Sequence, residues 1–219
     1  ISRDYRFVHI SDLQNSANRT SDVQKIVDMI QKENPEFVVI TGDLIDSYFV
    51  TNEQMKPFED LTVPIFLITG NHEYYLEEGK INEVIENTNI LLIDGMRIQF
   101  DELDIIGVNE LDTIAATIAK VGEVNPSRYT ILLDHEPKPE EVARASERGV
   151  DFMLSGHTHA GQVWPFGLLV QKLRYPYLSG LYRVNEMDLH INPGTGTIGP
   201  KMRLGTTSEV TIINLKPTP

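Results

Sequence analysis

Short apolar segments alternate with amphipathic segments along the chain up to His159. Apolar residues recur at helical spacing from Val23 to Ile30, which predicts a helix that ends before Asn34–Pro35. Uninterrupted apolar runs, rich in β-branched residues, are typical of strands that are buried on both faces. These predicted strands are Tyr5–Ile10, Glu36–Thr41, Pro64–Thr69, Tyr129–Asp134 and Val150–Ser155.

The rest of the chain adds shorter strands and two more helices. The predicted strands are Ile90–Ile93, Ile98–Phe100 and Leu103–Val108, and the predicted helices are Glu110–Val121 and Pro139–Arg148. From Gln162 onward, Gly, Pro and β-branched residues predict a tail made mostly of strands, the last at Glu209–Leu215. Strands alternating with helices, followed by such a tail, predict one α/β domain over residues 1–219.

Polar residues of metal-binding types follow the five buried strands. They are Ser11–Asp12, Gly42–Asp43, Gly70–Asn71–His72–Glu73, Asp134–His135 and Gly156–His157–Thr158–His159. Ligands of α/β sheets bind at the carboxyl ends of the strands, so we expect these groups to converge. A single Gly-Asp pair is usually a turn, and a single histidine is usually a core residue. The ordered combination instead favours a metal site.

Composition limits the chemistry of that site. The chain has no cysteine, so any metal must be held by nitrogen and oxygen, which suit Mn, Fe, Zn or a similar divalent ion. The net charge of −13 argues against a nucleic-acid partner, because phosphate-backbone binding needs a basic surface. The net charge does not exclude a phosphate-containing substrate, because bound divalent cations can invert the local electrostatic field in a cleft.

In this order, the motifs SDLQ, GDLID, GNHE, DHEP and GHTH resemble the signature of the calcineurin-like metallophosphoesterase superfamily. The resemblance covers Ile10 to His159. It extends through LSGLYR and NPGTGTIGPKMRLG toward a bacterial branch of membrane-associated phosphoesterases. It implies an α/β fold, namely a four-layer α-β-β-α sandwich of two mixed sheets flanked by helices, with two metals at the strand carboxyl ends.

The resemblance also implies a role for each motif residue. Asp12 and His159 match ligands of the first metal, and Asp43 matches the bridging ligand. Asn71, His135 and His157 match ligands of the second metal. His72 resembles the general acid, and Asp46 its acidic partner. The alternatives are that His72 only hydrogen-bonds a phosphate oxygen and that Asp46 is a cap.

One position departs from the family pattern, because Gln14 stands where the family has histidine. Its amide oxygen is neutral and harder than imidazole. We therefore expect the first metal site, with Gln14 as a ligand, to bind its ion more weakly and to prefer Mn or Mg over Zn. The alternative is a first site that is partly or wholly empty. Manganese is the first expectation for both metals, with Mg, Fe and Zn as further candidates.

These residues predict a binuclear metal-dependent phosphoesterase that hydrolyses a phosphomonoester, phosphodiester or pyrophosphate with a water bridging the two metals. The competing hypothesis is a non-catalytic metal- or phosphate-binding protein with a weakened first site at Gln14. A third hypothesis, a nuclease, is disfavoured by the charge. Trp164 is expected either to line a substrate cleft or to pack in the core, and Arg183 and Arg203 are candidates to meet a substrate phosphate.

The substrate itself does not follow from the metal ligands. By analogy with the membrane-associated relatives, we expect a small-molecule or lipid-linked phosphoester, no nucleic acid, and association with the extracytoplasmic face of a membrane. A cytoplasmic location is the alternative. The chain starts at Ile1 rather than at methionine, so we expect a trimmed or processed sequence, from which a leader or anchor cannot be read.

Overall fold

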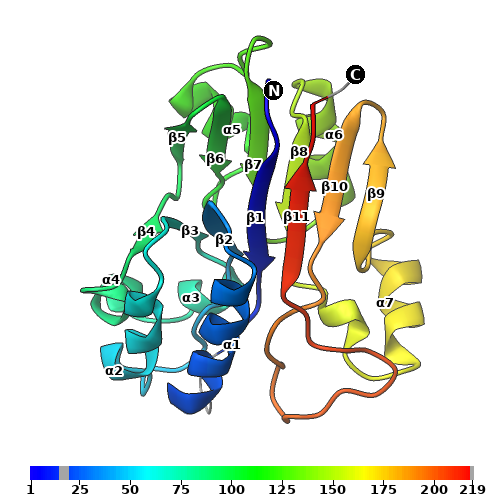
Figure 1. The fold of residues 1–219 in the computed structure, drawn as a ribbon. Helices are drawn as coiled ribbons and strands as arrows, with labels where there is room; N and C mark the ends of the chain where they lie inside the picture. The colour runs from blue at the N-terminus through cyan, green and yellow to red at the C-terminus, as the bar shows by residue number, and fades with distance from the viewer. Residues whose placement is uncertain (15–19, 218–219) are drawn as a thin grey trace.

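The computed structural model describes residues 1–14 and 20–217, in which helices flank two β-sheets (Figure 1). The five-stranded sheet has the order β11-β1-β2-β3-β4, and the six-stranded sheet has the order β5-β6-β7-β8-β10-β9. The strands of the first sheet are β1 (Tyr5–Ile10), β2 (Phe37–Thr41), β3 (Ile65–Ile68), β4 (Ile90–Leu92) and β11 (Thr211–Leu215). Those of the second are β5 (Met96–Phe100), β6 (Leu103–Gly107), β7 (Tyr129–Leu133), β8 (Phe152–Ser155), β9 (Gly180–Val184) and β10 (Met187–Ile191).

Both sheets are mixed. In the first, β1 to β4 run parallel, and β11 pairs antiparallel with β1 at the edge, opposing Leu215 to Tyr5. In the second, β6, β7, β8 and β10 run parallel between the antiparallel edge strands β5 and β9. Parallel strands place their carboxyl ends at one edge of a sheet, and that edge carries the motifs singled out above.

An apolar layer between the sheets holds them together. Alternate residues of a strand face opposite sides, so Phe7 and Phe37 point toward the second sheet while their neighbours point toward helices. Their rings stack with centroids 4.5 Å apart. Ile131 and Phe152 of the second sheet belong to the same buried cluster. The buried apolar area of this layer fixes the relative position of the two sheet edges.

Helices cover the outer face of each sheet. These are α1 (Thr20–Lys32), α2 (Asn52–Met55), η1 (Lys56–Asp60) and α4 (Lys80–Ile85) on the first sheet, and α5 (Ile114–Val121) and α6 (Pro139–Glu147) on the second. Val27 of α1 and Phe58 of η1 are buried against the first sheet. Ile118 and Val142 are buried against the second. The layers therefore run α-β-β-α, which confirms the fold predicted from the sequence.

Two elements differ from the prediction. Helix α5 begins at Ile114 rather than at Glu110, because the Thr113 hydroxyl caps it by accepting from the Ala116 N–H at 3.1 Å. The tail, predicted to be made mostly of strands, contains a helix that was not predicted, α7 (Phe166–Leu173). Neither α7 nor any other helix in the described part of the chain is long and apolar enough to cross a bilayer.

Candidate metal centre

Loops that follow β1, β2, β3, β7 and β8 meet at the carboxyl edge of the sheets, below the arrowhead of β1 in Figure 1. Backbone hydrogen bonds join them, from Asp12 N–H to the Gly42 carbonyl at 3.0 Å and from Gln14 N–H to the Asp43 carbonyl at 2.8 Å. The loops bring together all seven side chains predicted as metal ligands, Asp12, Gln14, Asp43, Asn71, His135, His157 and His159.

Asn71, His135 and His157 form one half of this cluster. Asn71 opens the short helix α3 (Asn71–Tyr74), and its Oδ1 lies 3.2 Å from His135 Nε2 and 2.9 Å from His157 Nδ1. The two ring nitrogens are 3.2 Å apart. Three donor atoms therefore point at one small volume.

The hydrogen bonds around the two rings fix which nitrogen faces that volume. His135 Nδ1 donates to the Thr41 carbonyl at 2.7 Å, so Nε2 is the nitrogen that faces that volume. His157 Nε2 lies 3.2 Å from the hydroxyl of Tyr175, which itself donates to the Glu136 carboxylate. Nδ1 of His157 is thus the nitrogen that faces Asn71 and His135. Such outer partners orient metal-binding histidines, and sequence reasoning missed both Tyr175 and Glu136.

Asp43 joins the two halves of the cluster. Its Oδ2 lies 3.4 Å from His135 Nε2 on one side and 3.3 Å from Gln14 Nε2 on the other. Its Oδ1 accepts the His72 N–H at 2.9 Å. A carboxylate in this place can contact two ions at once.

Asp12, Gln14 and His159 form the second half. Asp12 Oδ1 and His159 Nε2 lie 3.2 Å apart, and the other oxygen of Asp12 accepts the His157 N–H at 2.9 Å. Asp12 Oδ1, Gln14 Oε1 and His159 Nε2 are buried and make no hydrogen bond within the described residues. Such atoms cost about 1–3 kcal/mol each when left unsatisfied. A divalent cation would satisfy all three, so the donor set fits a metal ion.

The backbone of the cluster is also strained. Asp12, Gln14, Asp43, His157 and His159 have φ between 44° and 68°, in the left-handed region that L-residues rarely adopt. Strain of this kind concentrates at functional sites, where the surrounding structure holds it. The packing is correspondingly tight.

Glycine is required beside two of the donors. A Cβ at Gly156 would lie 1.9 Å from the Ser11 hydroxyl, and one at Gly70 would lie 2.4 Å from Asp43 Oδ1. The glycines before Asn71 and His157 therefore allow the backbone to approach closely.

Charges in the cluster perturb one another. Burial works against a charged His135, but the Asp43 carboxylate raises the pKa of His135 well above its usual value. Burial and the neighbouring His135 lower the pKa of His157 to about 4, so this ring is neutral at pH 7. A metal ion must displace the His135 proton, and its binding weakens as the pH falls.

His72 and Asp46 lie at the margin of the cluster. His72 Nε2 is 3.8 Å from Asp43 Oδ2, and 23% of its side chain is exposed. Asp46 is half-buried three residues beyond Asp43. The ring of His72 thus faces both the buried carboxylate and solvent, while its pairing with Asp46 stays a prediction.

The polar residues outside the motifs take other places. Arg203 donates to the carbonyls of Pro193, Gly194, Gly196 and His159, so it ties the loop before β11 to the centre and is not directed at a phosphate. Arg183 pairs with Asp188 and Glu186 on the exposed hairpin of β9 and β10. Trp164 is 64% exposed, which excludes the core position that was one of its two expectations.

Glu73 was quoted within a motif but given no role, and the structure gives it one. The buried carboxylate accepts the N–H groups of Gly70 at 2.8 Å and of Asp43 and Ile45 at 2.9 Å each. It therefore joins the loops after β2 and β3. Burial and the Asp43 charge raise the pKa of Glu73 to about 8, against the effect of these N–H groups. Its position at the third residue of α3 is a helix-start signal visible in the sequence.

This geometry defines a metal-binding α-β-β-α sandwich, and comparison with known proteins identifies its family. Residues 5–161 match the calcineurin-like phosphoesterase family. An uncharacterized metallophosphoesterase of Campylobacter jejuni is 33% identical over 99% of the chain, which covers 60% of that protein. A Danio rerio transmembrane protein with metallophosphoesterase domain is 33% identical over 90% of the chain, which covers 49% of it.

A dimetal phosphatase from Danio rerio has a TM-score of 0.56 at 10% identity over 87% of both chains, which shows a shared fold alone. The chain belongs to the calcineurin-like phosphoesterase family, and this membership implies divalent metal ions. It spans only about half to three fifths of the length of the two relatives above.

The contacts of Glu73 predict that Glu73→Gln lowers the free energy of unfolding by about 1–3 kcal/mol, because one end of the amide must face a backbone N–H that needs an acceptor. Urea titration of metal-free protein at about pH 9, above the pKa of Glu73, measures the change. Glu77→Gln, an exposed position in the same segment, should leave the midpoint unchanged. Equal stability of both variants would show that Glu73 does not hold the loops.

Proposed function

We propose that the chain is the catalytic domain of a binuclear metal-dependent phosphoesterase. The observation that carries the proposal is the position of Asp43, whose carboxylate lies between His135 and Gln14, 3.4 Å and 3.3 Å from their nitrogens. In this arrangement, Asp12, Gln14 and His159 would hold one ion. Asn71, His135 and His157 would hold the other, and Asp43 would be shared between them.

Two such ions, when bound, lower the pKa of a water and neutralise charge on a phosphoryl group. The protein itself orients the donors. His135 is held by the Thr41 carbonyl and His157 by Tyr175, so each ring presents one fixed nitrogen. Burial excludes competing water from the donors. The intact set of donors argues against a protein that only binds phosphate.

His72 supplies the proton that the leaving oxygen needs. Its ring is part exposed beside Asp43, so a substrate on the centre can reach Nε2. Asp46, on the same loop as Asp43, is the carboxylate that would orient this ring. Loss of the proton donor should matter most when the leaving group is a poor one.

Manganese is the metal that we propose for both positions. The first position has two oxygen donors, from Asp12 and Gln14, against one imidazole from His159, and oxygen-rich sites suit Mn and Mg better than Zn. Gln14 Oε1 is buried and lacks a hydrogen-bond partner among the described residues, which supports its role as a ligand rather than a spectator.

The substrate that we propose is a small-molecule or lipid-linked phosphoester, met at the extracytoplasmic face of a membrane. One relative is named as a transmembrane protein, which supports a membrane setting. The acidic net charge of −13 supports a substrate other than nucleic acid.

Asp43→Asn should abolish uptake of the second equivalent of Mn and lower hydrolysis of a chromogenic phosphodiester by at least about a hundredfold, since loss of an outer-shell partner alone costs about 10–100-fold. Metal analysis and initial rates measure the two effects. Asp188→Asn, which removes a carboxylate on β10, is the matched control. Normal rates at normal metal content in Asp43→Asn would contradict the proposal.

His72→Ala should slow a phenyl ester more than a p-nitrophenyl ester, because the poorer leaving group needs protonation more. We expect a loss of about a hundredfold for phenyl and clearly less for p-nitrophenyl, at unchanged metal content. The ratio of the two kcat/KM values is the measurement. An equal loss on both esters would show that His72 binds rather than protonates.

Gln14→His should raise the affinity of the first position for Zn relative to Mn by at least about tenfold, because imidazole is the softer ligand. Competition between the two metals, followed by metal analysis, gives the ratio. Gln31→His, at an exposed position of α1, controls for an added histidine. An unchanged ratio would mean that residue 14 does not contact the metal.

A further inference from the structure

Helix α7 is apolar but is not buried. Phe166, Leu168 and Leu173 are 60%, 62% and 72% exposed, and only Gly167 among its eight residues is buried. A helix that is apolar on several faces normally packs in a core or enters lipid. Exposed apolar residues gathered in this way mark an interaction site rather than a chance surface residue.

A neighbouring segment extends this apolar area. Trp164 N–H donates to the Leu204 carbonyl at 2.7 Å, and Leu204 N–H donates to the Gln162 carbonyl at 3.0 Å. These bonds place the exposed segment around Met202 and Leu204 beside the start of α7. We call the combined area the α7 surface, made of Trp164, Phe166, Leu168, Leu169, Leu173, Ile198, Met202 and Leu204.

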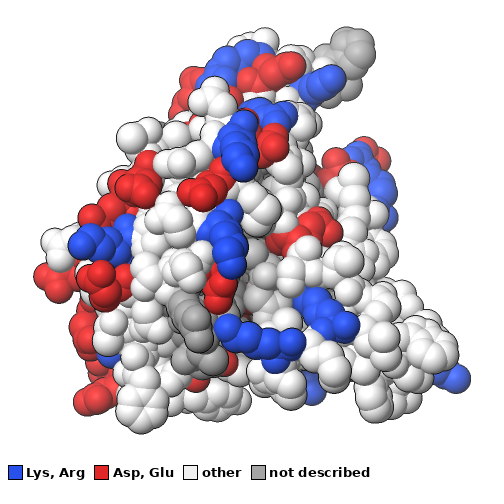
Figure 2. Space-filling view, turned by 60° about the horizontal axis from the view of Figure 1, so that its bottom comes forward, with Lys and Arg blue, Asp and Glu red and all other residues white. Residues whose placement is uncertain are grey.

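The net charge of the residues that follow Asp151 is positive, whereas that of the whole chain is negative. Of the 32 acidic residues only three, Glu186, Asp188 and Glu209, follow Asp151, whereas six of the 19 basic residues do. Lys172, Arg174, Lys201 and Arg203 accompany the α7 surface. In the view of Figure 2, acidic residues gather at the left. The charged residues at the lower right, on the side where Figure 1 has α7, are basic.

Two of these cations have acidic neighbours, Arg174 with Glu136 at 3.1 Å and Lys201 with Asp22 at 3.7 Å. Lys172 is exposed in the last turn of α7. The region thus offers cations at the rim of an apolar area, and it brings few carboxylates of its own.

The α7 surface also borders the metal centre. A cavity of about 400 Å³ is lined by His157, Leu169, Val170, Leu173, Arg174 and Tyr175. His157 is a proposed metal ligand, and Tyr175 lies 3.2 Å from its Nε2. The cavity is therefore bordered both by the apolar helix and by a proposed metal ligand.

We propose that the α7 surface docks on an anionic lipid bilayer. An exposed tryptophan, several exposed leucines and flanking lysine and arginine are the composition of a helix that lies in the bilayer interface. The local excess of cations complements anionic headgroups in a chain that is otherwise repelled by them. Docking in this way brings the cavity beside His157 to the level of the headgroups.

The proposal rests on the proposed function only for its consequence, that the hydrolysed phosphoester is carried by a lipid. Membrane docking itself needs no catalysis. Binding to vesicles and hydrolysis of a soluble ester are therefore measured separately, so that the two proposals can fail independently.

The test is flotation of the whole chain with vesicles of phosphatidylcholine alone or mixed equally with phosphatidylglycerol. We expect the protein to float with the mixed vesicles, less with phosphatidylcholine, and less at high salt. The double variant Phe166→Gln with Leu168→Gln should lower the partition coefficient by at least about tenfold, since two exposed apolar side chains lose their burial. Lys172→Glu should weaken binding to the mixed vesicles only.

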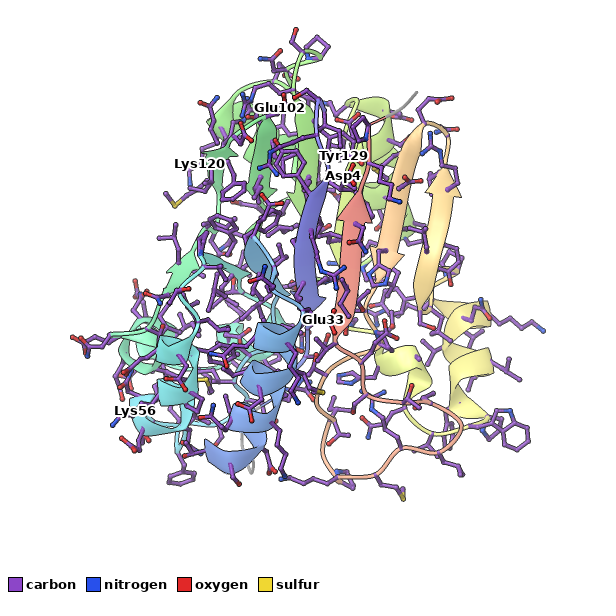
Figure 3. All side chains as sticks on the ribbon, in the orientation of Figure 1. Asp4, Glu33, Lys56, Glu102, Lys120 and Tyr129 are labelled. Atoms are coloured by element: carbon purple, nitrogen blue, oxygen red, sulfur yellow. The ribbon has the colours of Figure 1, made fainter. Side chains whose placement is uncertain are left out.

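Matched controls lie outside the α7 surface. Leu111→Gln replaces a leucine that is 66% exposed, and Lys56→Glu replaces an exposed lysine on the opposite flank (Figure 3). Both should float like the wild type. Hydrolysis of a soluble chromogenic phosphodiester should be unchanged in the α7 variants, which shows that they fold.

Wild-type protein that stays at the bottom of the gradient, or α7 variants that float like it, would overturn the docking proposal while leaving the hydrolase proposal intact. A wild-type dimer in solution that Phe166→Gln with Leu168→Gln converts to a monomer would overturn it too, by assigning the α7 surface to a second copy of the chain. Flotation without any hydrolysis would instead reject the proposed function.

Discussion

The burial of the Asp43 carboxylate is the constraint on which the arrangement of the centre depends. The residue is 1% exposed and contacts groups from three other loops, through Gln14, His72 and His135. A buried carboxylate is costly unless several donors or cations surround it. The backbone must therefore place those groups around Asp43. Glu73 contributes to this by accepting hydrogen bonds from backbone amides of two loops. The left-handed conformations at the donors follow from the same demand.

The packing between the sheets makes it possible for groups from both sheets to surround Asp43. Phe7 and Phe37 belong to a buried cluster that also contains Ile131 and Phe152, so the strand ends of one sheet are held opposite those of the other. Asp43 follows a strand of the first sheet and His135 one of the second, yet their side chains lie 3.4 Å apart. A loosely packed interface would not keep side chains from two sheets at that distance.

Much of this arrangement was predictable, because strand ends and donor types are local properties. The apolar runs gave the five central strands, and the polar motifs after them named the side chains that the structure brings together. Contacts between distant segments were not predictable. Glu73 bonds amides about thirty residues earlier, and Arg203 binds carbonyls of a glycine-rich loop and of His159, contacts that no spacing rule encodes. Helix α7 was missed because the glycines and prolines around it favour turns, and because apolar residues on several of its faces give no helical period.

Folding and metal binding are linked in such a centre. Without an ion, the described part of the folded chain leaves three buried ligand atoms of the centre, Asp12 Oδ1, Gln14 Oε1 and His159 Nε2, without hydrogen bonds. Each is a cost that the sheets and helices must offset. An ion that binds the folded chain and not the unfolded chain removes these costs and stabilises the fold by mass action. The same reasoning places the weak point at Gln14, because a neutral amide oxygen attracts a cation less than a carboxylate does. In the proposed binuclear centre, occupancy of the first position would therefore depend most on metal concentration.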